Sequence, residues 1–444
     1  MGRRRRRKAP PRGEFEAKIE SLSHDGRGVT HIDGKTVFLD GALPDERVLF
    51  EYTATSRKHD EGRVNQVLEA SPDRVEPRCA SFRLCGGCSL QHLDPDRQLA
   101  FKQQSMLEGL ERIGKVTPEQ VLEPLRAGIW GYRRKARLGV RHVRKKDRVL
   151  VGFREKRNSF ITDVSDCPVL DERVGARLTE IGAMIHSLDA RATLPQIEVA
   201  ITDDRVALVF RHLEPLSGDD RAKLIRFGEQ YGFDLYLQPG GPHTVQPLTE
   251  GCEALRYRHP DFDVAIEFSP LDFTQVNDGV NRLMVAQAAA LLDPRPDDRV
   301  LDLFCGLGNF TLPLARRAAE VAGVEGDAAM LERARRNAEA NGLHNTRYFV
   351  ADLMSDELGQ EPWLRQPWNR ILLDPPRSGA AEAIRHVGQL GARRIVYVSC
   401  HPGTLARDAG ELVHAHGYRL THAGVMDMFP HTAHVESMAV FEKA

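Results

Sequence analysis

The sequence predicts a multidomain α/β protein: an N-terminal OB-like β-barrel, a central α+β domain with a cysteine-rich segment, and a C-terminal Rossmann-like domain. Three observations support this fold class. Short strand patterns separated by Asp-Gly turns crowd residues 14–69, cysteines cluster just after them, and strand and helix patterns alternate from Leu271 onward. The 444 residues exceed one ordinary core, because domains usually hold about 100–200 residues.

The predicted domain boundaries follow these changes of pattern. Five short strand patterns (FEAKIESL, GVTHI, KTVFL, ERVLFEYT and GRVNQVL) predict a small barrel. Residues 95–113 predict a helix rich in Gln, Lys and Leu. We therefore assign residues 1–12 to a basic tail, 13–70 to the barrel, 71–268 to the central domain and 269–444 to the C-terminal domain.

Composition excludes several classes of protein. Hydrophobic residues make up 41% of the chain, and no apolar run approaches the roughly 20 residues that a membrane span needs. The arginines at the N-terminus precede no apolar segment, so a secretory signal is not expected. Seven cysteines are too few for a disulfide scaffold. We expect a monomer in the reducing cytoplasm, with no membrane partner.

The net charge of −1 conceals two basic regions. Residues 3–12 carry seven Lys and Arg and no acid, which could also be a solvated tail. Residues 131–157 carry twelve Lys and Arg against Asp147 and Glu155, with apolar residues interleaved. This asymmetry predicts a polyanionic partner, and a folded strand with one basic face favours a nucleic-acid surface.

The C-terminal domain reads as a parallel, doubly wound sheet. Its last two strand patterns, near residues 418–427 and 436–442, have a connection too short for a crossover, which predicts an antiparallel pair. This is the layout of class I S-adenosylmethionine (SAM) methyltransferases. Glycines follow the strand that bears Asp302, as they could in a dinucleotide enzyme, but Glu325 and Asp352 at the next two strand ends favour SAM.

Two later strands end in reactive groups. Asp374-Pro375-Pro376-Arg377 follows the fourth strand, and Cys400 follows the fifth at the ligand edge, where it is placed to be a nucleophile rather than a buried apolar residue. A methyltransferase needs a thiol if the target is carbon 5 of uracil, because thiolate addition to carbon 6 activates carbon 5. Positive charge from Arg377 or Arg407 is expected to favour the thiolate.

The cysteine-rich segment predicts a metal centre. Cys79, Cys85 and Cys88 lie within ten residues, and Cys167 precedes a proline much later. Four thiols suit zinc or an iron–sulfur cluster, and their spacing does not choose between these.

Five motifs in order, SPLDFTQVN, DLFCGLGNF, LLDPPRSG, YVSCHPGTLARD and HTAHVES, resemble those of the RNA uracil-C5 methyltransferase family across the whole chain. The resemblance implies Cys400 as nucleophile and Glu436 as general base. It also implies a TRAM-type RNA-binding barrel and a [4Fe-4S] cluster on Cys79, Cys85, Cys88 and Cys167. The SAM-contacting positions that it implies are Gln275, Phe304, Asn309, Glu325, Asp352 and Asp374.

The resemblance implies 5-methyluridine formation in 23S ribosomal RNA, although the sequence does not indicate which uridine. The alternatives are a transfer-RNA uridine, a second ribosomal uridine, or a non-catalytic RNA-binding assembly factor on a methyltransferase scaffold. The SAM-strand acids, Cys400 and Glu436 argue against the last of these.

Overall fold

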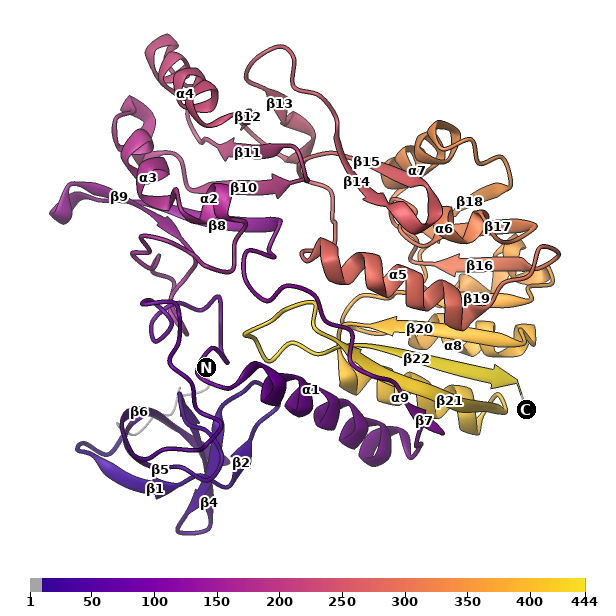
Figure 1. Cartoon of the computed structure of the whole chain (residues 1–444), viewed down its shortest axis with the longest axis horizontal. Coiled ribbons are helices and arrows are strands. Elements are labelled where there is room, and N and C mark those ends of the chain that lie inside the picture. The colour runs from indigo at the N-terminus through magenta and orange to yellow at the C-terminus, as the bar shows by residue number, and fades with distance from the viewer. Residues whose placement is uncertain (1–9, 444) are drawn as a thin grey trace, which may run out of the picture. The chain divides into compact units, whose positions relative to one another are not determined.

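The computed structural model of the protein describes residues 10–443. The predicted basic tail therefore lies mostly outside the described residues. The described chain forms two compact units (Figure 1). One holds residues up to 101 together with 153–162 and 430–434, and the other holds 102–152, 163–429 and 435 onward.

The N-terminal strands of the first unit form one sheet that closes on itself. Its strands, in the spatial order β1-β5-β6-β4-β3-β2, are β1 (Phe15–Lys18), β5 (Arg47–Thr55), β6 (His59–Glu69), β4 (Lys35–Asp40), β3 (Gly28–Ile32) and β2 (Ser21–Leu22). The end strands β1 and β2 are consecutive in the chain. Only Ile19 and Glu20 join them, and these donate backbone hydrogen bonds to Glu46 (2.9 Å) and Val29 (2.8 Å). The two edges therefore meet.

The barrel has six strands rather than the predicted five. The segment FEAKIESL, expected as one strand, divides into β1 and β2 because the chain must turn from one edge of the sheet to the other. Ile19, Leu39, Val48 and Phe50 fill the centre, each with no more than 1% of its surface exposed. A small closed sheet with this core fits the predicted OB-like fold.

The predicted helix over 95–113 is present as α1 (Pro95–Gly109) and a π-helical turn (Leu110–Gly114). Next in the chain comes a six-stranded mixed sheet of order β13-β12-β11-β10-β8-β9. Its strands are β8 (Lys135–Val143), β9 (Arg148–Gly152), β10 (Gln196–Ile201), β11 (Val206–Arg211), β12 (Phe233–Gln238) and β13 (Gln246–Pro247). The accompanying helices are α2 (Glu172–Gly175), α3 (Leu178–His186) and α4 (Gly218–Tyr231).

The C-terminal sheet confirms the predicted doubly wound layout, with strand order β18-β17-β16-β19-β20-β22-β21-β7 (Figure 1). Strands β16 to β20 run parallel, and β22 is antiparallel to both neighbours. The strands are β7 (Gln120–Val121), β16 (Arg299–Leu303), β17 (Glu320–Glu325), β18 (Thr346–Val350), β19 (Arg370–Leu373), β20 (Arg394–Ser399), β21 (Tyr418–Met426) and β22 (Glu436–Lys443).

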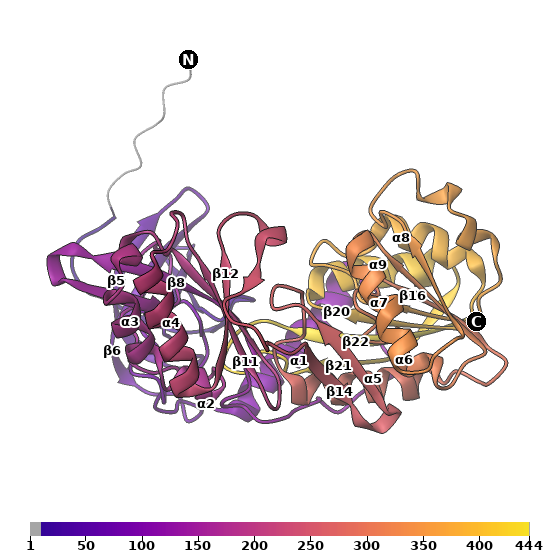
Figure 2. The same ribbon diagram turned by 90° about the horizontal axis from the view of Figure 1, so that it is seen from above.

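Helices cover both faces of this sheet (Figure 2). One apolar layer contains α5 (Asp278–Leu292), α6 (Thr311–Ala315), part of α7 (Ala328–Ala340) and the hairpin β14 (Leu255–His259)–β15 (Val264–Phe268). The opposite layer contains α8 (Ala381–Val387) and α9 (Pro402–His414). Leu301 and Leu303 belong to the second layer and Val300 to the first, as strand alternation requires. No helix in the described residues is long and apolar enough to span a membrane.

Candidate active site

Most of the residues predicted for SAM binding and catalysis lie at one edge of the C-terminal sheet. Parallel strands end at a common edge, and β16, β17, β18, β19 and β20 all end here. Glu325 ends β17 and pairs with Val350 at the end of β18, two residues before Asp352. Phe304 and Asp374 directly follow the paired residues Leu303 and Leu373.

Strand register brings Cys400 and Glu436 together. Ser399 of β20 pairs with Ser437 of β22 in antiparallel register. Continuing this register by one residue places Cys400 opposite Glu436, and the Glu436 charge is one of those that act on the Cys400 thiol. Directly opposed residues in antiparallel strands have Cβ atoms about 4.5–5.5 Å apart. The thiol and the carboxyl group are therefore neighbours, although 36 positions separate them in the chain.

The surroundings of Cys400 oppose the thiolate. Burial raises the pKa of Cys400 to about 11, with further contributions from the Glu436 and Asp374 carboxyl groups. Arg377 counteracts this in part. Arg407 instead donates hydrogen bonds to Asp408 (2.8 Å) and to the Ser378 carbonyl (3.1 Å). Arg377 therefore lowers the thiol pKa as expected and Arg407 does not act on it, but burial and two acids outweigh this one arginine in the free protein.

The two carboxyl groups beside the thiol also resist ionisation. Burial raises the pKa of Asp374 to about 7. Burial, and then the charge of Asp374, raises the pKa of Glu436 well above its usual value. In the described part of the chain, no salt bridge reaches Asp374 or Glu436. Asp374 can therefore exchange a proton near neutral pH, whereas Glu436 must lose its proton before it can accept one as a general base.

Sequence reasoning missed a buried lysine in this region. Lys102 of α1 is fully buried, and its ammonium group donates to Asp427 Oδ1 (2.7 Å) and to the Phe429 carbonyl (2.9 Å). The charge of Lys102 lowers the pKa of Glu436 and so opposes the effects of burial and Asp374. The only hint of burial in the sequence is that Lys102 follows two apolar residues, Ala100 and Phe101. Its partner Asp427 lies 325 positions away in the chain, so the pairing could not be predicted.

The glycine-rich loop after β16 has an unusual backbone. Phe304, Gly306 and Gly308 all have positive φ angles, of 64°, 55° and 93°. A non-glycine residue at such an angle is strained, and strain of this kind concentrates at ligand sites. A Cβ atom at Gly308 would lie 3.1 Å from the Leu312 side chain. The loop therefore needs glycine here, and its backbone is shaped for close approach to a ligand such as SAM.

Acids beside this loop are held by backbone groups. Glu325 accepts hydrogen bonds from the N–H groups of Gly326 (2.8 Å), Asp327 (3.2 Å) and Gly306 (3.3 Å). The exposed Asp352 accepts one from Met354 (2.9 Å). Both acids thus remain available to ligand hydroxyl or amino groups. Asp302 differs from them, because it is fully buried within β16 and accepts a hydrogen bond from Thr311 (2.5 Å).

Two predicted SAM positions have other surroundings. Asn309 exchanges side-chain hydrogen bonds with Asn281 (3.0 and 3.1 Å) and accepts one from the Tyr257 hydroxyl (3.2 Å). Its amide therefore anchors the glycine loop to neighbouring elements. Gln275 is half-buried in the segment before α5, and Phe273, two residues earlier, has 70% of its surface exposed.

Comparison with known proteins decides the family. A sequence model for the family described as tRNA (Uracil-5-)-methyltransferase matches residues 258–444. The chain is 56% identical to a 23S rRNA (uracil(1939)-C(5))-methyltransferase RlmD from Alkalilimnicola ehrlichii, covering 100% of this chain and 99% of that one. It is 53% identical to the enzyme of the same name from Methylococcus capsulatus, with 100% of both chains covered.

This chain belongs to the RNA uracil-C5 methyltransferase family. A solved structure agrees: the Pyrococcus abyssi tRNA (uracil-54, C5)-methyltransferase in complex with S-adenosyl-L-homocysteine matches with a TM-score of 0.74 and 26% identity, covering 96% of this chain and 100% of that one. The methyltransferase fold and the use of SAM predicted from the sequence are thereby confirmed at the level of the family.

In this methyltransferase the cysteine-rich segment lies in the first unit and Cys167 in the second, so each is described by itself. Cys85 and Cys88 are buried, and the Gly87 N–H donates to Cys85 Sγ (3.4 Å). The Gly86 N–H donates to the Arg154 carbonyl (2.8 Å), and a Cβ atom at Gly86 would lie 2.9 Å from that oxygen. Gly86 therefore lets the segment around Arg154 pack closely against the cysteine-rich segment.

The basic stretch of the methyltransferase is less uniform than its sequence indicates. Arg134 pairs with Asp203 (2.7 Å), Arg137 with Glu198 (2.5 Å) and Arg148 with Asp163 (2.9 Å). Burial lowers the pKa of Lys135 to about 8. Among the described residues, the exposed cations of the β8–β9 hairpin that form no ion pair are Arg141, Arg144, Lys145 and Lys146, whereas Arg137 and Arg148 are exposed but paired.

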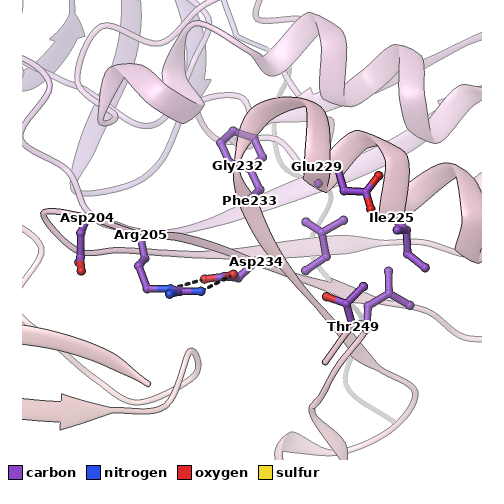
Figure 3. Close-up of a pocket in the computed structure, with 11 residues that line it drawn as sticks. Asp204, Arg205, Ile225, Glu229, Gly232, Phe233, Asp234 and Thr249 are labelled. Atoms are coloured by element: carbon purple, nitrogen blue, oxygen red, sulfur yellow. Dashed lines mark hydrogen bonds and ion pairs between the residues drawn. The ribbon is translucent and has the colours of Figure 1, made fainter. Parts of the chain in front are cut away.

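A pocket of about 410 Å³ lies in the six-stranded sheet domain, between α4 and the strand ends (Figure 3). At one side of it, Arg205 forms a two-point ion pair with Asp234, at 2.7 and 2.8 Å. None of the predicted site residues lines this pocket. Its charged lining is Asp204, Glu229 and Asp234 against Arg205, with no nucleophile among the lining residues, so it does not compete with the sheet edge as the active site.

Proposed function

We propose that this chain methylates carbon 5 of one uridine in 23S ribosomal RNA, corresponding to the uridine numbered 1939 in the names of its relatives. The observation that supports this most strongly is the register that sets Cys400 opposite Glu436. A nucleophile and a proton acceptor face each other beside a loop shaped for SAM. Uracil-C5 methylation needs both groups within reach of one pyrimidine ring.

The reaction follows from these two side chains. The Cys400 sulfur bonds to carbon 6 of uracil, and the ring electrons make carbon 5 nucleophilic. SAM supplies the electrophilic methyl group that carbon 5 requires. Glu436 then takes the proton from carbon 5, the double bond between carbons 5 and 6 re-forms, and the carbon–sulfur bond breaks to return the thiolate.

The elevated pKa values suit this sequence of steps. A thiol with a pKa of about 11 is almost wholly protonated at neutral pH, so the free enzyme is protected from oxidation and alkylation. Once uracil excludes water, the thiol proton must leave, and Asp374 with its pKa of about 7 is a suitable neighbouring acceptor.

The SAM site in this proposal contains Gln275, Phe304, Asn309, Glu325, Asp352 and Asp374. Glu325 would accept hydrogen bonds from ribose hydroxyls, and Asp352 would accept one from the adenine amino group. Phe273 offers an exposed aromatic face on which an RNA base can stack.

The experiment that tests this function uses an RNA fragment in which 5-fluorouridine replaces the target. In 5-fluorouridine, fluorine replaces the carbon 5 hydrogen, so the enzyme has no proton to remove and cannot release the cysteine. The covalent adduct should therefore persist on a denaturing gel when SAM is present. Cys400→Ala should form none, whereas Cys252→Ala, a cysteine outside the site, should form as much as the wild type.

The choice of RNA separates the alternatives. An adduct with the ribosomal fragment but not with a transfer-RNA fragment supports the proposal, and the reverse result would place the target in transfer RNA. Strong binding of both RNAs without any adduct would identify a non-catalytic assembly factor and overturn the proposal.

The N-terminal barrel acts in this proposal as a TRAM-type RNA-binding module, and the protein works as a cytoplasmic monomer. The four proposed parts are residues 1–12, 13–70, 71–268 and 269–444. The exposed cations Arg141, Arg144, Lys145 and Lys146 are offered as phosphate contacts. Replacing these four with Gln should weaken RNA binding and flatten its dependence on salt, because fewer counterions are released.

The cysteines Cys79, Cys85, Cys88 and Cys167 are proposed to hold a [4Fe-4S] cluster with a structural or RNA-contacting role, since methyl transfer moves no electrons through the protein. The buried sulfur atoms and the Gly87 N–H directed at Cys85 support iron–sulfur ligation. Anaerobically purified Cys85→Ser should lose its iron and brown absorbance, and Cys252→Ser should keep both. Full iron content in Cys85→Ser would exclude this ligand set.

A further inference from the structure

A group of potential metal ligands lies in the six-stranded sheet domain and includes none of the residues predicted for the active site or the cluster. It consists of His142 near the end of β8, Asp147 in the β8–β9 turn and His186 at the end of α3. One ligand atom from each residue lies within 4.8 Å of the others. Neither methyl transfer nor the cysteine-rich segment uses any of the three.

Each of the two histidines has a ring nitrogen without a hydrogen-bond partner among the described residues. These nitrogens, His142 Nε2 and His186 Nδ1, are both buried. Buried polar atoms are ordinarily satisfied, so two orphan nitrogens in one group call for an explanation. The rings lie side by side, with centroids 6.0 Å apart.

The separation between ligand atoms favours an ion over a direct contact. His142 Nε2 and Asp147 Oδ1 are 3.6 Å apart, which is too long for a good hydrogen bond. Two ligands of a tetrahedral ion with bonds of about 2.0–2.1 Å are about 3.4 Å apart. The observed gap therefore leaves room for one ion.

The backbone holds the three residues in these positions. Asp147 has a φ angle of 42°, in the left-handed region, and its N–H donates to the Arg144 carbonyl (3.2 Å). Gly182 lets α3 pack closely on the hairpin, because a Cβ atom there would lie 3.1 Å from the Val149 carbonyl. Residue 149 pairs with His142 across the hairpin, so helix, hairpin and turn converge on one point.

We propose that His142, Asp147 and His186 form a binding site for a zinc-class divalent ion that ties the β8–β9 turn to α3. Two imidazoles and one carboxylate are ligands that Zn²⁺ accepts, and the fourth position is left to solvent. The turn also carries the exposed cations Arg144, Lys145 and Lys146. A bound ion would hold this basic turn in a single conformation.

Zinc uptake by the full chain tests the site. Protein prepared anaerobically, with its cysteines in the same state in every variant, is titrated with Zn²⁺ against a chromophoric zinc chelator. The wild type should bind one more equivalent than His186→Gln and than Asp147→Asn. Asp147 is exposed, so its replacement leaves the fold intact if the histidine variant fails to fold. His344→Gln, an exposed histidine outside the group, should bind as the wild type does.

Trypsin provides a second readout that does not depend on methylation. Its cleavage sites after Arg144, Lys145 and Lys146 lie in the turn, so Zn²⁺ should slow cleavage there at least ten-fold in the wild type and not in Asp147→Asn. Equal zinc uptake by the wild type, His186→Gln and Asp147→Asn, or cleavage that Zn²⁺ leaves unchanged in the wild type, would overturn the proposal.

Discussion

Glu325 and Asp352, at the ends of β17 and β18, accept hydrogen bonds from backbone N–H groups. Asp374 and Glu436, at the end of β19 and the start of β22, have elevated pKa values and no salt bridge within the described chain. The first pair is prepared to bind polar ligand groups. The second pair is largely removed from water and has no cationic partner in an ion pair. The raised pKa values that result allow these two acids to exchange protons with a substrate. Under the proposed function, this sheet edge contains a binding half, with Glu325 and Asp352, and a reacting half, with Asp374 and Glu436.

The largest effect should come from Glu436→Gln in the reacting half. Gln cannot take the carbon 5 proton, so the methylated adduct should accumulate and turnover should fall about 10³-fold, within the range of general-base contributions. A denaturing gel with natural RNA and radiolabelled SAM measures both quantities. Glu442→Gln, at the far end of β22, is the matched control. If Glu436→Gln turned over at the wild-type rate, Glu436 would not be the general base, and the two groups of acids would not differ in function.

Asp302→Asn tests a residue of β16, the strand that leads into the glycine loop. Like Asp374, Asp302 is a buried carboxyl group with a raised pKa. Burial raises the pKa of Asp302 to about 7, so in the folded wild type its ionisation becomes costly as pH rises above the unfolded value. The free energy of unfolding of the wild type therefore decreases between about pH 4 and pH 7 because of this one group. Asn at position 302 cannot ionise, so the variant does not show this decrease. The difference in unfolding free energy should grow to about 4 kcal/mol in favour of Asn by pH 8.

Urea unfolding at several pH values measures this difference, with the exposed Asp297→Asn as control. A difference that does not change with pH would show that Asp302 ionises freely in the folded protein.

Glu325→Gln should affect cofactor binding alone. Gln keeps the shape but loses the charge that strengthens hydrogen bonds to ribose hydroxyls, so the KM for SAM should rise about ten-fold with little change in kcat. Steady-state kinetics with varied SAM measures both, and the exposed Glu332→Gln serves as the control. A fall in kcat at unchanged KM would instead assign Glu325 to the reacting half.

The smallest effect is expected from Lys102→Met, as a shift in pH dependence. The groups whose charges act on Glu436 are Asp374, Lys102 and Arg377, and loss of Lys102 raises the pKa of Glu436 further. The pH at which adduct resolution reaches half its maximal rate should therefore move upward. Combining the change with Asp427→Asn avoids an unpaired buried carboxylate. Asp427→Asn alone keeps the lysine charge and should show no upward shift.

Much of this arrangement could be predicted from the sequence because it depends on local patterns. Alternating strand and helix patterns predicted the C-terminal sheet, and the short last connection predicted that β21 and β22 are antiparallel. The opposition of Cys400 and Glu436 follows from that topology once the register is known. The division of FEAKIESL into two strands depends on barrel closure, which no local pattern records.

Other features depend on contacts between distant residues. Lys102 meets Asp427 across 325 positions, so its role at Glu436 was not foreseen. The thiol pKa was expected to fall near arginines, but burial and two carboxyl groups raise it. Likewise, the sequence counted Arg134, Arg137 and Arg148 as free positive charges, but each forms an ion pair with an acid that is distant in the chain. Charge counted along a chain does not reveal which charges are already neutralised.

The position of β22 between β20 and β21 has a consequence for how the enzyme loses activity. A strand bonded on both sides cannot detach without breaking two ladders, so local fraying is suppressed there. Amide protons of Ser437 and Met438 should therefore exchange with deuterium only through global opening. Heat should abolish catalysis at the same temperature at which the C-terminal domain melts, with no earlier loosening of the reactive pair.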